Sequence, residues 1–479
     1  MVASQTGGPS DDFCRRTAIR YSAAIVLLFL VLVLLQVATG SLQLGRLRVA
    51  GVDPVELYVY LPSLFFDGDL DFKNEYQHFS PEFLESGQWP ETAIGHRTNP
   101  HGIGMALAQS PFYAAAYIAV AVKKRCFPVR QEFKYMPLFE YAWYLGNIFW
   151  SAFAAFLLAW WLRRDVGVKR ALPVAVFFFL ATPLLYYAFP LLPMSHQVSL
   201  ACILMFLLCL GKWKNTLKNR WCLAAGVSLG FALSVHLLNA VYVLFGAMYL
   251  LLGDPGNEGL AGAFGTERVK RLLNPSGLIF MGALIGFLPQ LVTQKVIFGS
   301  FLLNPYRPDC PTSQFSVSLS NLQTAWNVAF SLKHGFAAWH PILAIALAGL
   351  LWAVLRGGAP LRLSISGLSV ILATWALLGG FINWWAGWSF GHRLFISVYP
   401  FFALGIAAFA DSFLECKRLW KVLVLWSCAS ILVLWNVLFL IQYKLGIIPR
   451  GETITFHEYL WQKLLLLRAL LTGRIVLPL

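Results

Sequence analysis

The chain has 479 residues, of which 58% are hydrophobic and only 12% are charged, and its mean hydropathy is +0.65. Soluble domains carry about 25% charged residues, so this composition excludes an ordinary soluble protein. The formal net charge of +15 does not indicate nucleic-acid binding, because the lysines and arginines stand in short clusters between apolar runs, as in the cytoplasmic loops of membrane proteins.

Apolar runs recur from end to end of the chain, and a membrane-spanning helix needs about 20 such residues. The sequence therefore predicts an all-α polytopic membrane protein, a bundle of about 11 transmembrane helices (range about 10–13) with outer juxtamembrane helices. The first span, at 21–40, follows three arginines, is expected to stay uncleaved and leaves the N-terminus in the cytoplasm. Further spans are predicted at 141–162, 171–190, 197–210, 221–235, 238–252, 278–297, 341–354, 368–384, 395–413 and 422–440.

Residues 41–140 are predicted to form one outer loop between the first two spans. It opens with an acidic stretch at 51–76 that contains Asp53, Glu56, Asp67, Asp69, Asp71 and Glu75, out of only 22 acidic residues in the chain. Carboxylates crowded at a membrane surface repel one another and lose hydration, so they mark a place that handles cations, protons or polar substrates. Residues 103–122 are expected at the outer interface, because a span there would put the later basic clusters outside.

Asp53 and Glu56 stand three residues apart just beyond the first span. On a helix this spacing puts both carboxylates on one face, where they could share a proton, a metal ion or a substrate hydroxyl. The alternative is a pair of ordinary solvated carboxylates at a helix end. Asp67 and Asp69, in FDGDLDF, fit either a cation-binding loop or an amphipathic interfacial piece, and the lack of a distal glutamate excludes an EF-hand.

Two histidines interrupt apolar segments at predicted outer helix ends, His196 in PMSHQ and His236 in SVHLLN. An ionisable group at membrane depth is a candidate for substrate binding, and a hydrogen-bonded histidine at a helix end is the alternative. The same topology places all nine histidines on the outer side.

Two further segments carry candidates for binding an anionic substrate. His101 in RTNPHGIG lies near Arg97, on a loop that suits a phosphate contact. His392 and Arg393 end the run NWWAGWSFGHR, whose three tryptophans suit either a sugar ring or an aromatic belt at the interface. Arg393 is the best single phosphate-binding candidate, because a guanidinium matches phosphate geometry.

The expected organisation is a cytoplasmic N-terminus at 1–20, a transmembrane module at 21–443 that includes the outer loop 41–140, and a tail at 444–479. The tail is expected to form an outer interfacial helix or one more short span. Residues 304–316, NPYRPDCPTSQFS, are expected to be a proline-broken outer loop.

The whole pattern resembles the GT-C class of integral-membrane glycosyltransferases, and most closely the bacterial relatives of the protein O-mannosyltransferase and aminoarabinose transferase families. The matching pieces are YLPSLFFDGDLDF, NPHGIGMALAQSPF, PMSHQVS, PQLVTQKVIFGS and WWAGWSFGHRLFISVYPFFALG. In that class the first helix leads into a large outer loop with a catalytic acidic residue, and amphipathic juxtamembrane helices adjoin a cavity that is open to lipid.

The resemblance implies a hexosyl- or pentosyltransferase of the bacterial inner membrane, with its active site at the periplasmic face. The donor would be a polyprenyl-phosphate sugar and the acceptor a lipid, a glycan or a protein. Asp53 would be the general base, Glu56 would position the acceptor or a metal ion, and Arg393 with Arg97 would hold the donor phosphate. No cofactor is required by the resemblance, and the presence of a divalent cation is left open.

The chain departs from the family pattern at two places. Pro54 and Val55 follow Asp53 where many relatives have a second acidic residue, and His236 stands where relatives often have a basic residue followed by proline. The alternative function is a transporter or flippase of a lipid-linked or polar solute, with the acidic residues as a proton or cation relay. Such a protein should show inverted repeats, and the sequence contains no internal repeat.

Overall fold

The structure, a computed structural model, describes residues 11–38, 48–188, 193–252, 266–302, 320–357, 361–414 and 418–472, and the predicted loop 304–316 lies outside them. Within these ranges the chain is helical, apart from an isolated antiparallel bridge between Glu91 and Arg97. Seven of the described helices are long and apolar enough to cross a membrane, and three shorter apolar helices accompany them. The predicted all-α polytopic membrane protein is confirmed.

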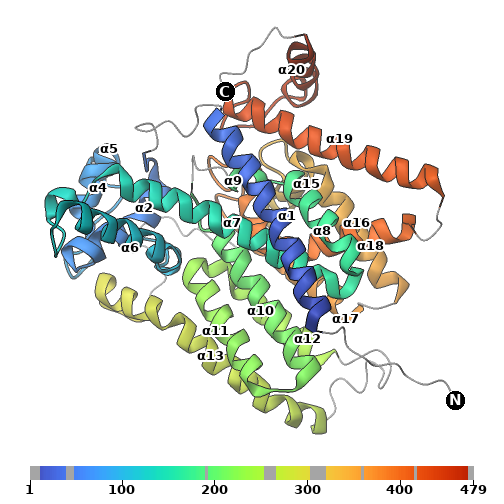
Figure 1. Ribbon diagram of the computed structural model, residues 1–479, viewed down its shortest axis with the longest axis horizontal. Helices are drawn as coiled ribbons and strands as arrows, with labels where there is room; N and C mark the ends of the chain where they lie inside the picture. The colour runs from blue at the N-terminus through green and yellow to red at the C-terminus, as the bar shows by residue number, and fades with distance from the viewer. Residues whose placement is uncertain are drawn as a thin grey trace.

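The first helix, α1 (Asp11–Ala38), packs against α7 (Pro137–Val166). Between them come several short helical segments and one longer helix, at one side of the molecule in Figure 1. The short segments are α2 (Val52–Tyr58), α3 (Tyr60–Pro62), a π-helical turn (Ser63–Asp67), α4 (Lys73–Phe79) and α5 (Pro81–Glu85), and the longer helix is α6 (Gly104–Lys124). Helix α6 contacts α2 and α3, so α2 to α6 and the loop up to α7 form one unit with the acidic stretch, which we call the outer unit after the side of the membrane predicted for it. By length and composition α6 could also span a membrane, and its interfacial position stays a prediction.

The remaining helices form the bundle of Figure 1. They are α8 (Val168–Leu180), α9 (Leu184–Ala188), α10 (His196–Thr216), α11 (Asn219–Val235), α12 (Val241–Leu251), α13 (Thr266–Phe298), α14 (Ser320–Phe330), α15 (Phe336–Trp339), α16 (Pro341–Arg356), α17 (Leu361–Gly379), α18 (Tyr399–Leu414), α19 (Leu419–Lys444) and α20 (Gln462–Leu471). Short 3-10 turns precede α12 and α18, at Leu237–Ala240 and Arg393–Val398.

Three predicted boundaries differ from the structure for identifiable reasons. The span expected at 171–190 is broken into α8 and α9 just before Pro183, since proline lacks the N–H that would continue the helix. In place of the span expected at 368–384, α17 runs over Leu361–Gly379. The helix ends at Gly379, although the apolar residues Phe381 and Ile382 follow it. Helix α13 begins well before position 278, in a stretch too polar to be counted as membrane-spanning.

The closest helix pair, α11 and α13, is joined through glycines, and the two helices run side by side in Figure 1. Gly226 and Gly230 on α11 face Gly282 and Gly286 on α13, so each helix carries a G-x-x-x-G pattern. A Cβ added at Gly230 would lie 2.0 Å from the carbonyl oxygen of Ala283. The two backbones can therefore touch only because these side chains are missing, which is a common device between membrane helices.

The other face of α13 is covered with apolar side chains that no described residue buries. An apolar surface of this extent on a long helix suits contact with lipid tails. The exposed residues are Leu273, Phe280, Met281, Leu284, Ile285, Leu288, Val292 and Val296.

The glycine contact gives a stability prediction with a control on the partner helix, α13. Replacing Gly230 with alanine should destabilise the protein by about 1–3 kcal/mol, because the new methyl group overlaps the α13 backbone. Gly277→Ala is the control, since a Cβ there has no neighbour within 4 Å. Thermal unfolding in one detergent should show a lower Tm for Gly230→Ala and an unchanged or higher Tm for Gly277→Ala. Equal Tm values for the two variants would contradict the close backbone contact at Gly226, Gly230, Gly282 and Gly286, which we call the glycine seam.

Candidate active site

The site is built around an ion pair between Asp53 and Arg393, which are 340 positions apart in the chain. Gly51 has a φ of 87°, which glycine adopts readily, and turns the chain into α2 so that Asp53 lies in its first turn. Arg393 starts the turn that leads into α18. Its Nη2 atom donates to Oδ2 of Asp53 over 2.5 Å. Burial would raise the pKa of Asp53, but the charges of Arg393 and of the nearby His101 outweigh it and hold the pKa below its usual range.

Glu56 lies one turn further along α2 and has an exposed fraction of only 2%. Its Oε1 atom accepts a hydrogen bond from the indole N–H of Trp89 over 2.6 Å, and its Oε2 atom lies 3.3 Å from Nε2 of His101. Burial raises the pKa of Glu56 to about 7, although the charge of His101 opposes this shift. The pKa values of the two carboxyl groups therefore move apart, which is how neighbouring carboxylates acquire different chemical roles.

His101 stands between the two carboxylates. Its Nε2 atom is 3.9 Å from Oδ1 of Asp53 as well as close to Glu56. Burial alone would lower the pKa of His101, but the negative charges of the neighbouring Asp53 and Glu56 raise it. The backbone of His101 donates to Oδ1 of Asn99 over 3.0 Å and accepts from the hydroxyl of Tyr60 over 2.7 Å. These bonds fix the backbone of His101, and the two carboxylates lie on the Nε2 side of its ring.

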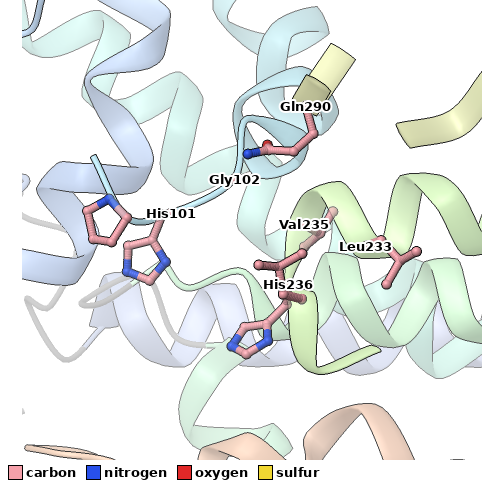
Figure 2. Close-up of a pocket in the computed structure, with 8 residues that line it drawn as sticks. His101, Gly102, Leu233, Val235, His236 and Gln290 are labelled. Atoms are coloured by element: carbon pink, nitrogen blue, oxygen red, sulfur yellow. The ribbon is translucent and has the colours of Figure 1, made fainter. Parts of the chain in front are cut away.

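The loop after His101 packs directly onto the end of α11 and leaves a small pocket beside the histidine (Figure 2). Gly102 makes this approach possible, because a Cβ there would lie 2.0 Å from the carbonyl oxygen of Ser234. Gln290 of α13 accepts a hydrogen bond from the backbone N–H of Ile103 over 2.9 Å and closes the other side. The pocket is lined by Pro100, His101, Gly102, Leu233, Val235, His236, Leu237 and Gln290.

The structure also brings His196 and His236 to this centre. Their ring centroids are 6.0 Å apart, and His196 interacts electrostatically with Arg393, Asp53 and His101. His236 lies at the end of α11, where its Nδ1 atom accepts a hydrogen bond from the backbone of Leu238 over 3.2 Å. Six predicted site residues from distant parts of the chain therefore converge: Asp53, Glu56, His101, His196, His236 and Arg393.

Two other residues predicted to bind substrate have different surroundings. Arg97 pairs with Glu91 over 3.1 Å and donates to the carbonyl oxygen of Trp89 over 3.2 Å, so it shapes its own loop. His392 is buried and packs edge-on against Phe395, at a centroid distance of 5.1 Å. It precedes Arg393 in the chain, and its role in substrate binding stays a prediction.

The other acidic candidates hold the outer unit together. Asp67 accepts hydrogen bonds from Asn74 and Gln131 and forms an ion pair with the buried ammonium of Lys134, which also pairs with Glu75. Asp69 accepts a hydrogen bond from the hydroxyl of Ser63 over 2.8 Å. Asp67 and Asp69 therefore bond to side chains of their own loop, which agrees better with an interfacial segment than with a cation-binding loop.

Four residues that position the site were not singled out from the sequence: Tyr60, Trp89, Asn99 and Gln290. Nothing in the sequence around a loop tryptophan shows that its indole N–H donates to a carboxylate, so the role of Trp89 could not be predicted. Asn99, in contrast, precedes His101 by two residues and also donates to the carbonyl oxygen of Glu56 over 2.7 Å. Gln290 is a polar residue in the apolar run PQLV, which was a usable signal.

Ligand-type atoms of Asp53, Glu56 and His101 all lie within 4.8 Å of one another, which raises the question of a metal ion. The surrounding charges do not fit one. The guanidinium of Arg393 already neutralises Asp53, and the indole of Trp89 occupies one oxygen of Glu56. A divalent cation would have to displace these partners and tolerate Arg393 next to it.

No family model matches the chain, and no curated protein matches its sequence. Among solved structures it is similar to the crystal structure of the oligosaccharyltransferase of Archaeoglobus fulgidus in its apo form, with 12% sequence identity and a TM-score of 0.46. The match covers 96% of this chain and 55% of that one, so this chain spans little more than half the length of the archaeal protein. A likeness this distant does not establish an activity.

The charge arrangement predicts how the purified protein responds to metal ions. Millimolar Mg²⁺ or Mn²⁺ should leave its Tm unchanged, because Arg393 already compensates Asp53. The measurement is thermal unfolding of wild type and Asp53→Asn with added metal or with EDTA. A metal-dependent rise in Tm that disappears in the variant would contradict this prediction.

The outer unit gives a second stability prediction. Lys134→Gln should lower stability by about 3–5 kcal/mol, because it leaves the carboxyl groups of Asp67 and Glu75 together without a cation. Burial raises the pKa of Glu75 to about 7 even though Lys134 opposes this shift. The loss should therefore grow as the pH rises through about 7, where this group becomes charged. Thermal unfolding across this pH range checks it, with the exposed Lys123→Gln as the control.

Proposed function

We propose that this chain is a GT-C-type glycosyltransferase that moves a sugar from a polyprenyl-phosphate donor to an acceptor at the periplasmic face of a bacterial inner membrane. The observation that carries the proposal is the Asp53–Arg393 pair, which joins a carboxylate cluster to an arginine at the ends of apolar helices. Glycosyl transfer from a lipid phosphate needs an anion-binding group for the leaving phosphate and a group that activates the acceptor.

Arg393 has spare hydrogen-bonding capacity that suits a phosphate. One terminal nitrogen bonds Asp53, but Nη1 reaches only the sulfur of Met194 at 3.9 Å, and Nε is buried without a hydrogen bond among the described residues. Unsatisfied buried donors cost about 1–3 kcal/mol each, and phosphate oxygens would satisfy them in the forked geometry that guanidinium favours. The donor phosphate is accordingly assigned to the side of Arg393 that faces away from Asp53.

A lipid-linked donor fits the position of this arginine. Arg393 lies at the start of an apolar helix, so a phosphate bound to it would sit where the polar headgroup of a membrane lipid ends. The isoprenoid chain would remain among the apolar helix faces while the sugar enters the site. The acceptor is a lipid, glycan or protein, and a single displacement at the anomeric carbon would invert the sugar.

One observation favours a second candidate, a transporter or flippase of a lipid-linked or polar solute. The buried Glu56, whose pKa is about 7, stands beside His101, and such a pair could pass protons near neutral pH. A transporter of this kind would move protons across vesicle membranes together with its solute. A glycosyltransferase would release lipid phosphate and form a new glycosidic bond instead.

The test is transfer of radiolabelled sugar from a panel of polyprenyl-phosphate donors by the full chain in nanodiscs. Arg393→Gln should lower kcat/KM by about 10²–10³-fold, since it removes a charge that stabilises the leaving phosphate. Arg97→Gln is the matched control and should keep most activity, because Arg97 pairs with Glu91. Asp53→Asn should also lower the rate, because it breaks the pair that holds Arg393 in place.

Two results would contradict the proposal. Equal losses for the two arginine variants would remove Arg393 as the donor-phosphate site. No transfer from any donor, together with proton-coupled solute uptake into vesicles, would favour the transporter.

A further inference from the structure

We propose that His101, oriented by Glu56, is the group that takes the proton from an acceptor hydroxyl bound in the pocket between His101, His236 and Gln290. The inference rests on the proposed glycosyl transfer and gives this base role to a residue other than Asp53. It also limits the acceptor to a molecule that presents a hydroxyl group.

Access to the pocket distinguishes the three acid–base groups of the site. Oδ2 of Asp53 accepts from Arg393, and both oxygens of Glu56 face partners, Trp89 on one side and His101 on the other. Of the three, only His101 lines the pocket (Figure 2). A bound acceptor therefore meets His101 first, while Glu56 stands behind it.

The arrangement Glu56–His101–acceptor is that of a carboxylate that orients an imidazole base. With Nε2 directed at the carboxylates, the N–H of a neutral ring belongs on Nε2. Nδ1 makes no hydrogen bond to any described residue, so its lone pair is free to accept a proton. The backbone bonds to Asn99 and Tyr60 fix the position of the residue, and the contact of Nε2 with Glu56 at 3.3 Å orients the ring.

The opposite wall of the pocket supplies hydrogen-bond donors. Nδ1 of His236 accepts from the backbone of Leu238, which puts the proton of a neutral ring on Nε2. The side-chain oxygen of Gln290 accepts from the backbone of Ile103, which leaves its amide N–H₂ group for a ligand. A hydroxyl can accept from one of these donors and donate to His101 at the same time, so the set matches an alcohol.

In the reaction, the acceptor oxygen forms a bond to the anomeric carbon of the sugar while its proton moves to Nδ1 of His101. The bond between that carbon and the donor phosphate oxygen breaks, and the electron pair leaves with the phosphate, which Arg393 holds. The imidazolium that forms is stabilised by the Glu56 carboxylate at its Nε2 side. Asp53 stays ionised and keeps Arg393 in position.

The first test combines kinetics with chemical rescue. His101→Ala should lower kcat by about 10²–10⁴-fold, the usual contribution of a general base. Binding of the sugar-free polyprenyl phosphate should change by less than about threefold, since its site is Arg393. Added imidazole should restore part of the rate, which it cannot do for a merely structural residue. His457→Ala, an exposed histidine far along the chain, is the control and should behave as wild type.

A second test uses Glu56→Gln. The new amide would donate to Nε2 of His101 and force the ring proton onto Nδ1, so kcat should fall without a loss of phosphate binding, and imidazole should not rescue it. The wild-type rate should rise with pH as the Glu56–His101 pair loses its shared proton. Asp53, Arg393, Tyr76, His196 and His236 also interact electrostatically with the pair, so the profile is assigned to Glu56 and His101 only if Glu56→Gln removes the rise.

Infrared difference spectra between about pH 6 and about pH 8 separate failure of this inference from failure of the proposed function. A protonated-carboxyl band that is lost in Glu56→Gln and shifted in His101→Ala establishes the coupled pair without any turnover. If the band responds in this way but no donor is used, the glycosyl-transfer proposal fails. If transfer occurs and His101→Ala keeps the wild-type rate, or loses it only through weaker phosphate binding, the base role of His101 is overturned.

Discussion

The ion pair between Asp53 and Arg393 is the contact on which the charge distribution of the whole site depends. Two carboxylates one helical turn apart, one of them buried, repel each other and do not both ionise readily without a cation nearby. Arg393 supplies that charge from a segment 340 positions away and fixes which carboxylate is ionised. The remaining proton then belongs to Glu56 and His101 together: burial, with the charge of Asp53 beside it, raises the pKa of Glu56 to about 7, and His101 opposes this shift.

The same contact ties the outer unit to the helix bundle. The outer unit is held internally by the buried pairing of Lys134 with Asp67 and Glu75, and its helix α2 is tied to the bundle by the ion pair of Asp53 with Arg393, in the turn before α18. Breaking one partner of such a buried pair leaves a charge without compensation, which is more costly than never having built the pair. The geometry of the site is therefore fixed by the outer unit, which holds Asp53, and by the helix bundle, which holds Arg393.

The sequence predicts the class of fold and most residues of the site, but it does not predict which of these residues pair with one another. Apolar runs reveal helices, because a membrane requires about 20 apolar residues in succession. Ionisable residues next to such runs, such as His196 and Arg393, are conspicuous for the same reason. Pairings are not visible, because nothing local to Arg97 or Arg393 tells which one reaches Asp53. Nor can composition reveal that Trp89 and Asn99 serve Glu56 through an N–H or an amide.

The glycine seam between α11 and α13 has a consequence for how this site can diversify. The end of α11 carries His236 and α13 carries Gln290, so the pocket wall opposite His101 belongs to the two helices that the seam joins. At the seam glycines no side chain separates the two backbones, so a larger residue there moves the helices apart and cannot bring them closer. The spacing behind this wall is therefore adjustable in one direction only, from positions that do not line the pocket.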